Sequence, residues 1–174
     1  MEKILLHICC AGCAGVCIER LQNDGFKVTG LFYNPNIHPE EEYIRRKHDL
    51  QTVAETYGID IIEDVYDPAV WHQAVKGRES DPEGGERCGI CFELRLRRVY
   101  EYAVDRGYKY FTTTLTVSPH KNSDCINTLG NSINGDRFLE RNFKKRDGFV
   151  QSVRISEHLC LYRQNYCGCV HSMR

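Results

Sequence analysis

Residues 3–13 read KILLHICCAGC, a short apolar run that ends in three closely spaced cysteines. The run predicts a strand over Lys3–Ile8, and the residues that follow, as far as Gly25, predict a helix closed by a glycine. A strand followed at once by a helix is the first unit of an α/β fold. This stretch therefore indicates the fold class and places three thiols at the end of the first strand.

Three further strands are expected along the chain, each separated from the next by helical segments. The expected strands cover residues 27–33, 59–62 and 110–115. The expected helices cover residues 40–57, 67–75, 88–107, 118–133 and 150–159. Because strands and helices alternate, we expect one α/β domain over residues 1–174, with a parallel sheet flanked by helices and a cysteine-bearing C-terminal tail.

Composition and charge narrow the functional classes. Hydrophobic residues make up 41% of the 174 residues, which is enough for an ordinary core. No apolar run approaches the length of a membrane span, and the first residues are too short a run for a signal peptide, so we expect a cytoplasmic protein with no membrane partner. The net charge of −1 excludes an overall electrostatic field that attracts nucleic acid. Three local basic runs could still bind phosphates, or could form solvated helix faces: Arg45–Lys47, Arg95–Arg98 and Lys144–Arg146.

Ten cysteines are the most unusual feature of the composition. In a reducing compartment such a number favours metal binding or redox chemistry over structural disulfides. Most of them form three groups, which are Cys9, Cys10 and Cys13, then Cys88 and Cys91, then Cys167 and Cys169. The clustering agrees with ligand or redox roles.

Cys88 and Cys91 form a Cys-x-x-Cys motif that suits zinc, an iron–sulfur cluster or a redox dithiol. Together with Cys9 and Cys10 they make a set of four sulfurs. Adjacent cysteines are awkward around one tetrahedral ion, whereas they can bind different irons of a cubane. The set therefore favours a [4Fe–4S] cluster, with zinc as the alternative.

The expected sheet brings two unusual segments together. Ligands of parallel sheets lie beyond the carboxyl ends of the strands, where the strand order reverses. The first strand delivers the Cys9 segment to that edge and the fourth delivers residues 112–121, which include His120. His120 precedes an expected helix and could donate a proton to developing negative charge, or could serve in capping or substrate binding.

Cys167-Gly168-Cys169 can close only a small, strained disulfide ring, which is easily reduced. That property suits a transient two-electron store, and two additional metal ligands on a flexible tail are the alternative. Cys13 could bind an additional metal ion or line the site. The other three cysteines lie in helical patterns and are expected to be buried as small apolar residues: Cys17, Cys125 and Cys160.

Five motifs occur along the chain in a characteristic order. They are His7–Cys13, Tyr33–Ile37, Glu86–Cys91, the pair Thr113–Leu115 with Ser118–Lys121, and Tyr162–Cys169. Together they resemble the cobalamin-independent epoxyqueuosine reductase family, often called QueH, over nearly the whole chain. The resemblance agrees with a Rossmann-like sheet of the HUP type. It implies removal of the epoxide oxygen from epoxyqueuosine at the tRNA wobble position, the last step of queuosine biosynthesis.

The resemblance also implies roles for individual residues. Cys9, Cys10, Cys88 and Cys91 would hold a [4Fe–4S] cluster, and Cys167 with Cys169 would form a redox-active pair. A second, mononuclear iron would lie near the cluster, with Cys13 as its neighbour. The implied partners are the modified tRNA and an electron donor that the sequence does not identify.

One residue departs from the family pattern, which usually has proline where this chain has Gly12. Glycine frees a backbone angle that proline would fix, so we expect the cluster sulfurs to be retained and the position of Cys13 to be affected. Two other functions remain as alternatives. One is an ATP-dependent, thiolase-like tRNA-modifying enzyme, although the first strand ends in cysteines and not in a glycine-rich phosphate loop. The other is a zinc-stabilised RNA-binding module.

Overall fold

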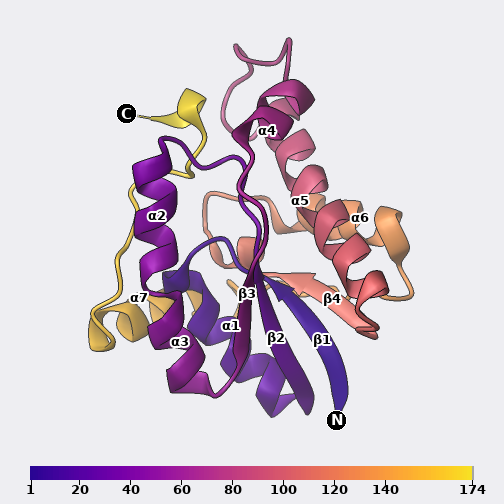
Figure 1. The fold of residues 1–174 in the computed structure, drawn as a ribbon, viewed down its shortest axis with the longest axis vertical. Helices are drawn as coiled ribbons and strands as arrows, with labels where there is room; N and C mark the ends of the chain where they lie inside the picture. Colours follow the sequence, from indigo (N-terminus) through magenta and orange to yellow (C-terminus); the bar gives the residue numbers. More distant parts are fainter. Residues whose placement is uncertain (174) are drawn as a thin grey trace.

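A four-stranded parallel sheet lies at the centre of the structure, a computed structural model that describes residues 1–173 (Figure 1). The strand order is β3-β2-β1-β4, and every adjacent pair is parallel. The strands are β1 (Glu2–His7), β2 (Phe26–Phe32), β3 (Asp60–Glu63) and β4 (Tyr110–Thr113). The four expected strands and their parallel arrangement are therefore confirmed.

Seven α-helices of the described residues flank this sheet. They are α1 (Ala11–Asn23), α2 (Glu40–His48), α3 (Leu50–Tyr57), α4 (Pro68–Ala74), α5 (Glu86–Asp105), α6 (Ser123–Asn134) and α7 (Gly148–His158). There are also two short 3₁₀ helices. The first, η1 (Thr114–Val117), directly follows β4, and the second, η2 (Val170–Ser172), lies near the end of the described residues. Helices α1 and α3 cover one face of the sheet, with α7 packed on the outside of α1, whereas α5 and α6 lie on the other face.

The apolar run of β1 is buried on both faces. Ile4 and Leu6 pack in the core below α1, and Leu5 packs with Phe111 in the core below α5. Successive side chains of a strand point to opposite faces, so a central strand covered by helices on both sides reads as a continuous apolar run. This burial explains why residues 4–6 carry no polar side chain.

The expected helix over residues 40–57 is wrong as one unit, because it is divided at Asp49. This residue ends α2 and begins α3, and its carboxylate accepts hydrogen bonds from His48 and from the backbone N–H of Tyr162. An aspartate that bonds outside the helix favours a boundary over a helical interior.

The expected cap at Ser118-Pro119 is also wrong. Asn122 caps α6, since its side-chain oxygen accepts from the backbone N–H groups of Asp124 and Cys125. The residues after β4 first form η1, which is held by the Thr113 hydroxyl. The helix therefore begins later than the proline suggested.

The strand order reverses between β1 and β4. From β1 the chain proceeds outward through β2 and β3, and β4 then pairs with the opposite side of β1. The carboxyl ends of β1 and β4 consequently lie side by side where the strand order reverses, which is where parallel sheets bind ligands. Among the described helices, none is long and apolar enough to cross a membrane.

Candidate functional site

Three sulfur atoms meet at the carboxyl end of β1. The Sγ atoms of Cys9, Cys10 and Cys13 all lie within 4.8 Å of one another, and Cys9 and Cys10 are 3.8 Å apart. Cys9 and Cys10 are buried, and Cys13 is half-buried. Cys10 is the N-cap of α1, so Cys13 lies one turn along the same helix face. The geometry makes these three thiols a compact candidate metal site.

Hydrogen bonds make the three sulfurs unequal in acidity. Donation from the Cys10 and Cys13 thiols holds the pKa of Cys9 well below its usual range, and Lys121 and Thr114 act in the same direction. The pKa of Cys10 is lowered by Cys13, but the hydrogen bond to Cys9 and burial raise it further, to about 11. Donation to Cys10 and Cys9 raises the pKa of Cys13 well above its usual range. One thiolate is therefore stabilised within the group, and thiolates are the metal-binding form.

Other elements support these sulfurs. The hydroxyl of Thr114, just after β4, donates to Cys9 Sγ (3.3 Å) and accepts from the Cys9 backbone N–H (3.1 Å). Gln164 of the C-terminal tail donates to Cys10 Sγ (3.0 Å). The site is therefore built from β1, the end of β4 and the tail.

Cys88 and Cys91 lie in the first two turns of α5. Cys88 packs against the apolar cluster that contains Cys9 and Cys10, and its sulfur accepts a hydrogen bond from the Gly84 backbone N–H (3.2 Å). Burial raises the pKa of the Cys88 thiol. Within residues 1–173, the only candidate metal group with all donors within 4.8 Å is the set of Cys9, Cys10 and Cys13. The four-sulfur set that includes both α5 cysteines stays a prediction.

Cys91 lies closer to the C-terminal tail. It packs with Cys169 and Cys167 around Trp71, and its sulfur lies 3.4 Å from Nη2 of the buried Arg95. Arg95 also donates to the Cys91 carbonyl oxygen (3.1 Å). Arg95 therefore contacts both the sulfur and the backbone of Cys91.

Cys167 and Cys169 are free thiols with opposite acidities, as all ten cysteines are free in the structure. The hydrogen bond from Cys169 lowers the pKa of Cys167 to about 5 against the effect of burial, and Ser172 and Lys121 add to the lowering. The same bond and burial raise the pKa of Cys169 far above its usual range. The opposite shifts favour the thiolate at Cys167 and the protonated thiol at Cys169.

The sequence interpretation included Lys121 in the segment after β4 but gave it no role of its own. Its ammonium group lies near enough to lower the pKa of both Cys9 and Cys167. His120 itself is exposed in the turn that precedes the Asn122 cap, and its backbone N–H donates to Ser118 Oγ. The signal for Lys121 was its place in the same segment after β4.

His7 holds the backbone from which the cysteines project. It is fully buried and bonds through Nδ1 to Thr113 Oγ1 (2.9 Å) and through Nε2 to the Tyr33 carbonyl oxygen (3.0 Å). Burial lowers the pKa of His7 to about 4, with a smaller effect from Arg95. His7 is therefore neutral at pH 7 and ties β1 to β4 and to the segment after β2.

Several sequence expectations outside the sulfur groups need correction. Cys17 is buried as expected, but Cys125 is only half-buried and Cys160 is exposed, because Cys160 follows the end of α7 in a left-handed conformation. Arg46 and Arg95 of the basic runs are buried, which excludes both a solvated face and phosphate contact for them. Their charges serve internal contacts.

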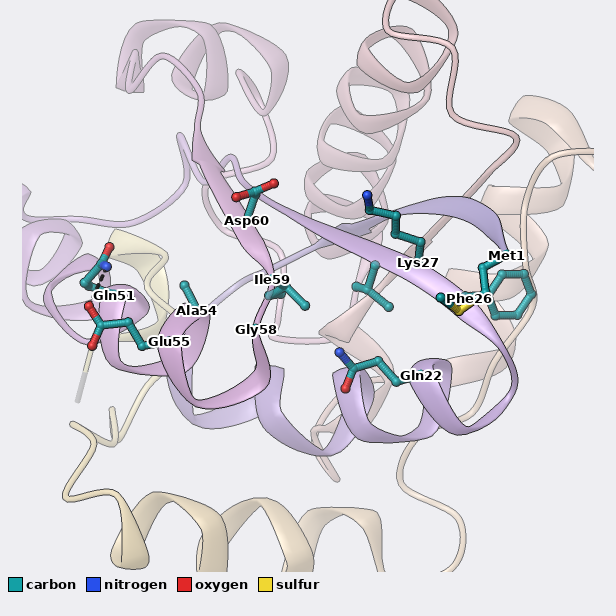
Figure 2. A pocket seen from close by; sticks show the side chains of 11 residues that line it. Met1, Gln22, Phe26, Lys27, Gln51, Ala54, Glu55, Gly58, Ile59 and Asp60 are labelled. Carbon is teal, nitrogen blue, oxygen red and sulfur yellow. Dashed lines mark hydrogen bonds between the residues drawn. The ribbon is translucent and has the colours of Figure 1, made fainter.

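An open surface pocket of about 680 Å³ lies away from this site. Figure 2 shows that it is lined by the end of α1, by α3 and by the amino-terminal ends of β2 and β3. The cysteines lie beyond the opposite, carboxyl ends of the strands. None of the predicted site residues lines this pocket.

The sequence of this chain matches one protein-family model and several named proteins over nearly its whole length. The sequence model of the family described as "Epoxyqueuosine reductase QueH" matches residues 4–174. Proteins with that name are similar to this chain in Acinetobacter baylyi (39% identity over 99% of this chain and 81% of the relative), Streptococcus pyogenes (38%, 99% and 71%) and Thermotoga maritima (36%, 99% and 91%).

One solved structure supports the fold. The NMN synthetase from Francisella tularensis superposes with a TM-score of 0.57 at 14% identity, and the match covers 96% of this chain and 67% of that protein. At so low an identity the likeness concerns the fold alone. The expected Rossmann-like sheet of the HUP type is confirmed.

Proposed function

The chain belongs to the epoxyqueuosine reductase QueH family, and we propose that it reduces epoxyqueuosine to queuosine at the wobble position of tRNA. This reaction is the last step of queuosine biosynthesis and makes the protein an oxidoreductase. The observation that carries the proposal is the group of Cys9, Cys10 and Cys13 sulfurs at the sheet edge where α/β enzymes bind ligands. We assign the activity to residues 1–174 as one domain and to the cytoplasm, where the tRNA substrate is found.

We propose that Cys9, Cys10, Cys88 and Cys91 hold a [4Fe–4S] cluster. The stabilised Cys9 thiolate, the contact of Cys88 with the same apolar cluster and the guanidinium beside Cys91 support this ligand set. Cys13 is a near neighbour of Cys9 and Cys10, which supports its role beside a second iron. When bound, these groups supply single-electron transfer and Lewis-acid polarisation of an oxygen atom.

The reaction consumes two electrons and two protons, because the epoxide oxygen leaves as water and an alkene remains. Oxidation of the Cys167 thiolate and the Cys169 thiol to one disulfide releases two electrons and one proton, so the second proton has to come from another donor. We assign the second half-reaction to Cys167 and Cys169. Cys167 provides the thiolate and Cys169 holds a proton, as their opposite pKa shifts favour. An external electron donor then reduces the disulfide for the next turnover.

His120 is our candidate for the proton donor to the departing oxygen. It is exposed in the segment after β4, on the side of the sheet where the cysteines lie. Histidine is the side chain that most often transfers protons in general acid–base catalysis. Lys121 beside it supplies positive charge facing the sulfurs.

The test is anaerobic purification of the wild-type protein and of the Cys88→Ala variant, with Cys160→Ala as the control at an exposed cysteine outside the site. We expect iron and inorganic sulfide in the wild type, broad absorption near ~400 nm, and reduction of epoxyqueuosine in tRNA. Cys88→Ala should lose all three, and the control should keep them. Retention of the absorption and activity in Cys88→Ala would reject the ligand set.

The same preparation tests the alternatives. Zinc without iron or sulfide would favour the RNA-binding module. ATP-dependent adenylation of tRNA would favour the ATP-using enzyme. Either result would replace the proposed reductase.

A further inference from the structure

The C-terminal tail, residues 162–173, returns from the end of α7 along α2 (Figure 1). Arg46 of α2 donates from Nη1 to the carbonyl oxygen of Cys167 (3.0 Å) and from Nη2 to that of Tyr166 (2.9 Å). The Arg46 side chain is only 2% exposed. A planar guanidinium that binds two consecutive carbonyl oxygens holds the backbone in one orientation.

Glu42 holds this guanidinium from the opposite side. Its Oε1 accepts from Arg46 Nε (2.7 Å), and its Oε2 accepts from the hydroxyl of Tyr162 at the start of the tail (2.9 Å). Glu42 is also buried, with a side chain 6% exposed. Because buried charges are costly unless they are paired and hydrogen-bonded, the Glu42–Arg46 pair depends on its contacts with the tail. One ion pair therefore contacts the tail at two places.

The glycine between the two cysteines fits closely against this pair. Gly168 has a φ of +106°, and its carbonyl oxygen accepts from the His38 backbone N–H (2.7 Å). A Cβ at this position would lie 3.1 Å from Arg46 Nη1 and 3.0 Å from Ile37 Cγ1. The carbonyl groups of residues 166, 167 and 168 are thus all engaged. The path of the backbone on both sides of the Cys167 sulfur is set by α2 and the segment before it.

We propose that Arg46, held by Glu42, is a positioning residue that keeps Cys167 and Cys169 in the geometry in which the backbone N–H of Cys169 donates to the Cys167 sulfur (3.4 Å). The inference rests on the proposed function only for the redox role of the two cysteines. It goes beyond that function because Arg46 touches neither sulfur and acts through the tail backbone. A purely structural ion pair would affect unfolding without changing the relative reactivity of the two thiols.

The test compares Arg46→Lys with the wild-type holoprotein. Lysine keeps the charge but lacks the fork that reaches two carbonyl oxygens and Glu42. Arg106→Lys is the matched control, since Arg106 is an exposed arginine at the end of α5 that pairs with Asp105. Quantitative mass spectrometry gives the alkylation rates of Cys167 and Cys169 by iodoacetamide at pH 7, and steady-state kinetics give kcat and KM on the modified tRNA.

We expect Arg46→Lys to reduce the ratio of Cys167 to Cys169 alkylation by ~10-fold or more, because the Cys167 sulfur loses the hydrogen bond from the Cys169 backbone N–H. The kcat should fall by ~10-fold or more while KM stays within about twofold, as for a misplaced reacting group. Arg106→Lys should behave as the wild type. A folded Arg46→Lys protein with an unchanged alkylation ratio would overturn the inference.

Gly168→Ala provides a second test that leaves the charges in place. The added methyl group is forced against Arg46 and Ile37, and the φ of +106° disfavours alanine. It should change the alkylation ratio in the same direction even if Arg46→Lys does not fold, and an unchanged ratio would again overturn the inference. Absence of reductase activity in the wild type would reject the proposed function, whereas the alkylation ratio alone would still decide the role of Arg46.

Discussion

Gly12 and Ser156 are expected to be energetically coupled across the contact between α1 and α7. A Cβ at position 12 would lie 2.9 Å from the hydroxyl oxygen of the buried Ser156. That hydroxyl donates to the Ser152 carbonyl oxygen (2.7 Å) and accepts from Arg163 Nη1 (3.2 Å). Gly12→Ala therefore has to displace a hydrogen-bonded side chain. A proline at position 12 would add a Cβ in the same place, so the Ser156 hydroxyl explains why glycine fits this chain.

The magnitude follows from two opposing effects of Gly12→Ala. Alanine in place of glycine favours the helix by up to about 1 kcal/mol. Displacing the Ser156 hydroxyl leaves buried polar groups unpaired, which costs about 1–3 kcal/mol. We expect Gly12→Ala to lower the free energy of unfolding by about 1 kcal/mol, and Ser156→Ala to lower it by a similar amount through the lost hydrogen bond.

The double variant should be more stable than the sum of these effects predicts. Once the hydroxyl is absent, the methyl group added at position 12 meets no polar atom at 2.9 Å, so the coupling free energy should be about 1–2 kcal/mol. Urea unfolding of the wild type, both single variants and the double variant, followed by circular dichroism, measures this cycle. Additivity within about 0.5 kcal/mol would refute the reasoning.

Three other perturbations test separate parts of the structure. Burial lowers the pKa of His7 to about 4, so on acidification the unfolded chain binds a proton before the folded protein does. The free energy of unfolding should therefore fall by up to roughly 3 kcal/mol as the pH drops from 6.5 to 4. An equally steep fall in the His7→Gln variant would contradict this origin. Because Lys121 contributes to the lowered pKa of Cys167, Lys121→Met should raise the pH midpoint of Cys167 alkylation relative to the wild type, and an unchanged midpoint would show that Lys121 does not act on this thiol. Trp71 is fully buried against Cys91 and Cys169. Trp71→Ala should therefore lower the free energy of unfolding, measured by urea titration, by about 3–5 kcal/mol. A loss below about 1 kcal/mol would contradict the burial of Trp71 in the core.

The fold was predictable because its signals are local. An apolar run such as residues 3–8 and the glycines that end helices act through neighbours in the chain, and alternation of strands and helices then implies the parallel sheet. The division at Asp49 was not predictable in this way. Its carboxylate bonds to Tyr162, more than a hundred residues along the chain. A boundary stabilised by such a partner leaves no periodic signal in its own segment.

The sequence by itself determined the α/β class, the placement of Cys9 and Cys10 at the end of a central strand, and the resemblance to a reductase family. Each of these depends on residue type and spacing along the chain. Only the tertiary structure decided that Arg46 is buried under the tail and that Lys121 acts on both Cys9 and Cys167. Hydrogen bonds require contact distances and charge interactions weaken with separation, so both depend on distances between segments that the sequence leaves far apart.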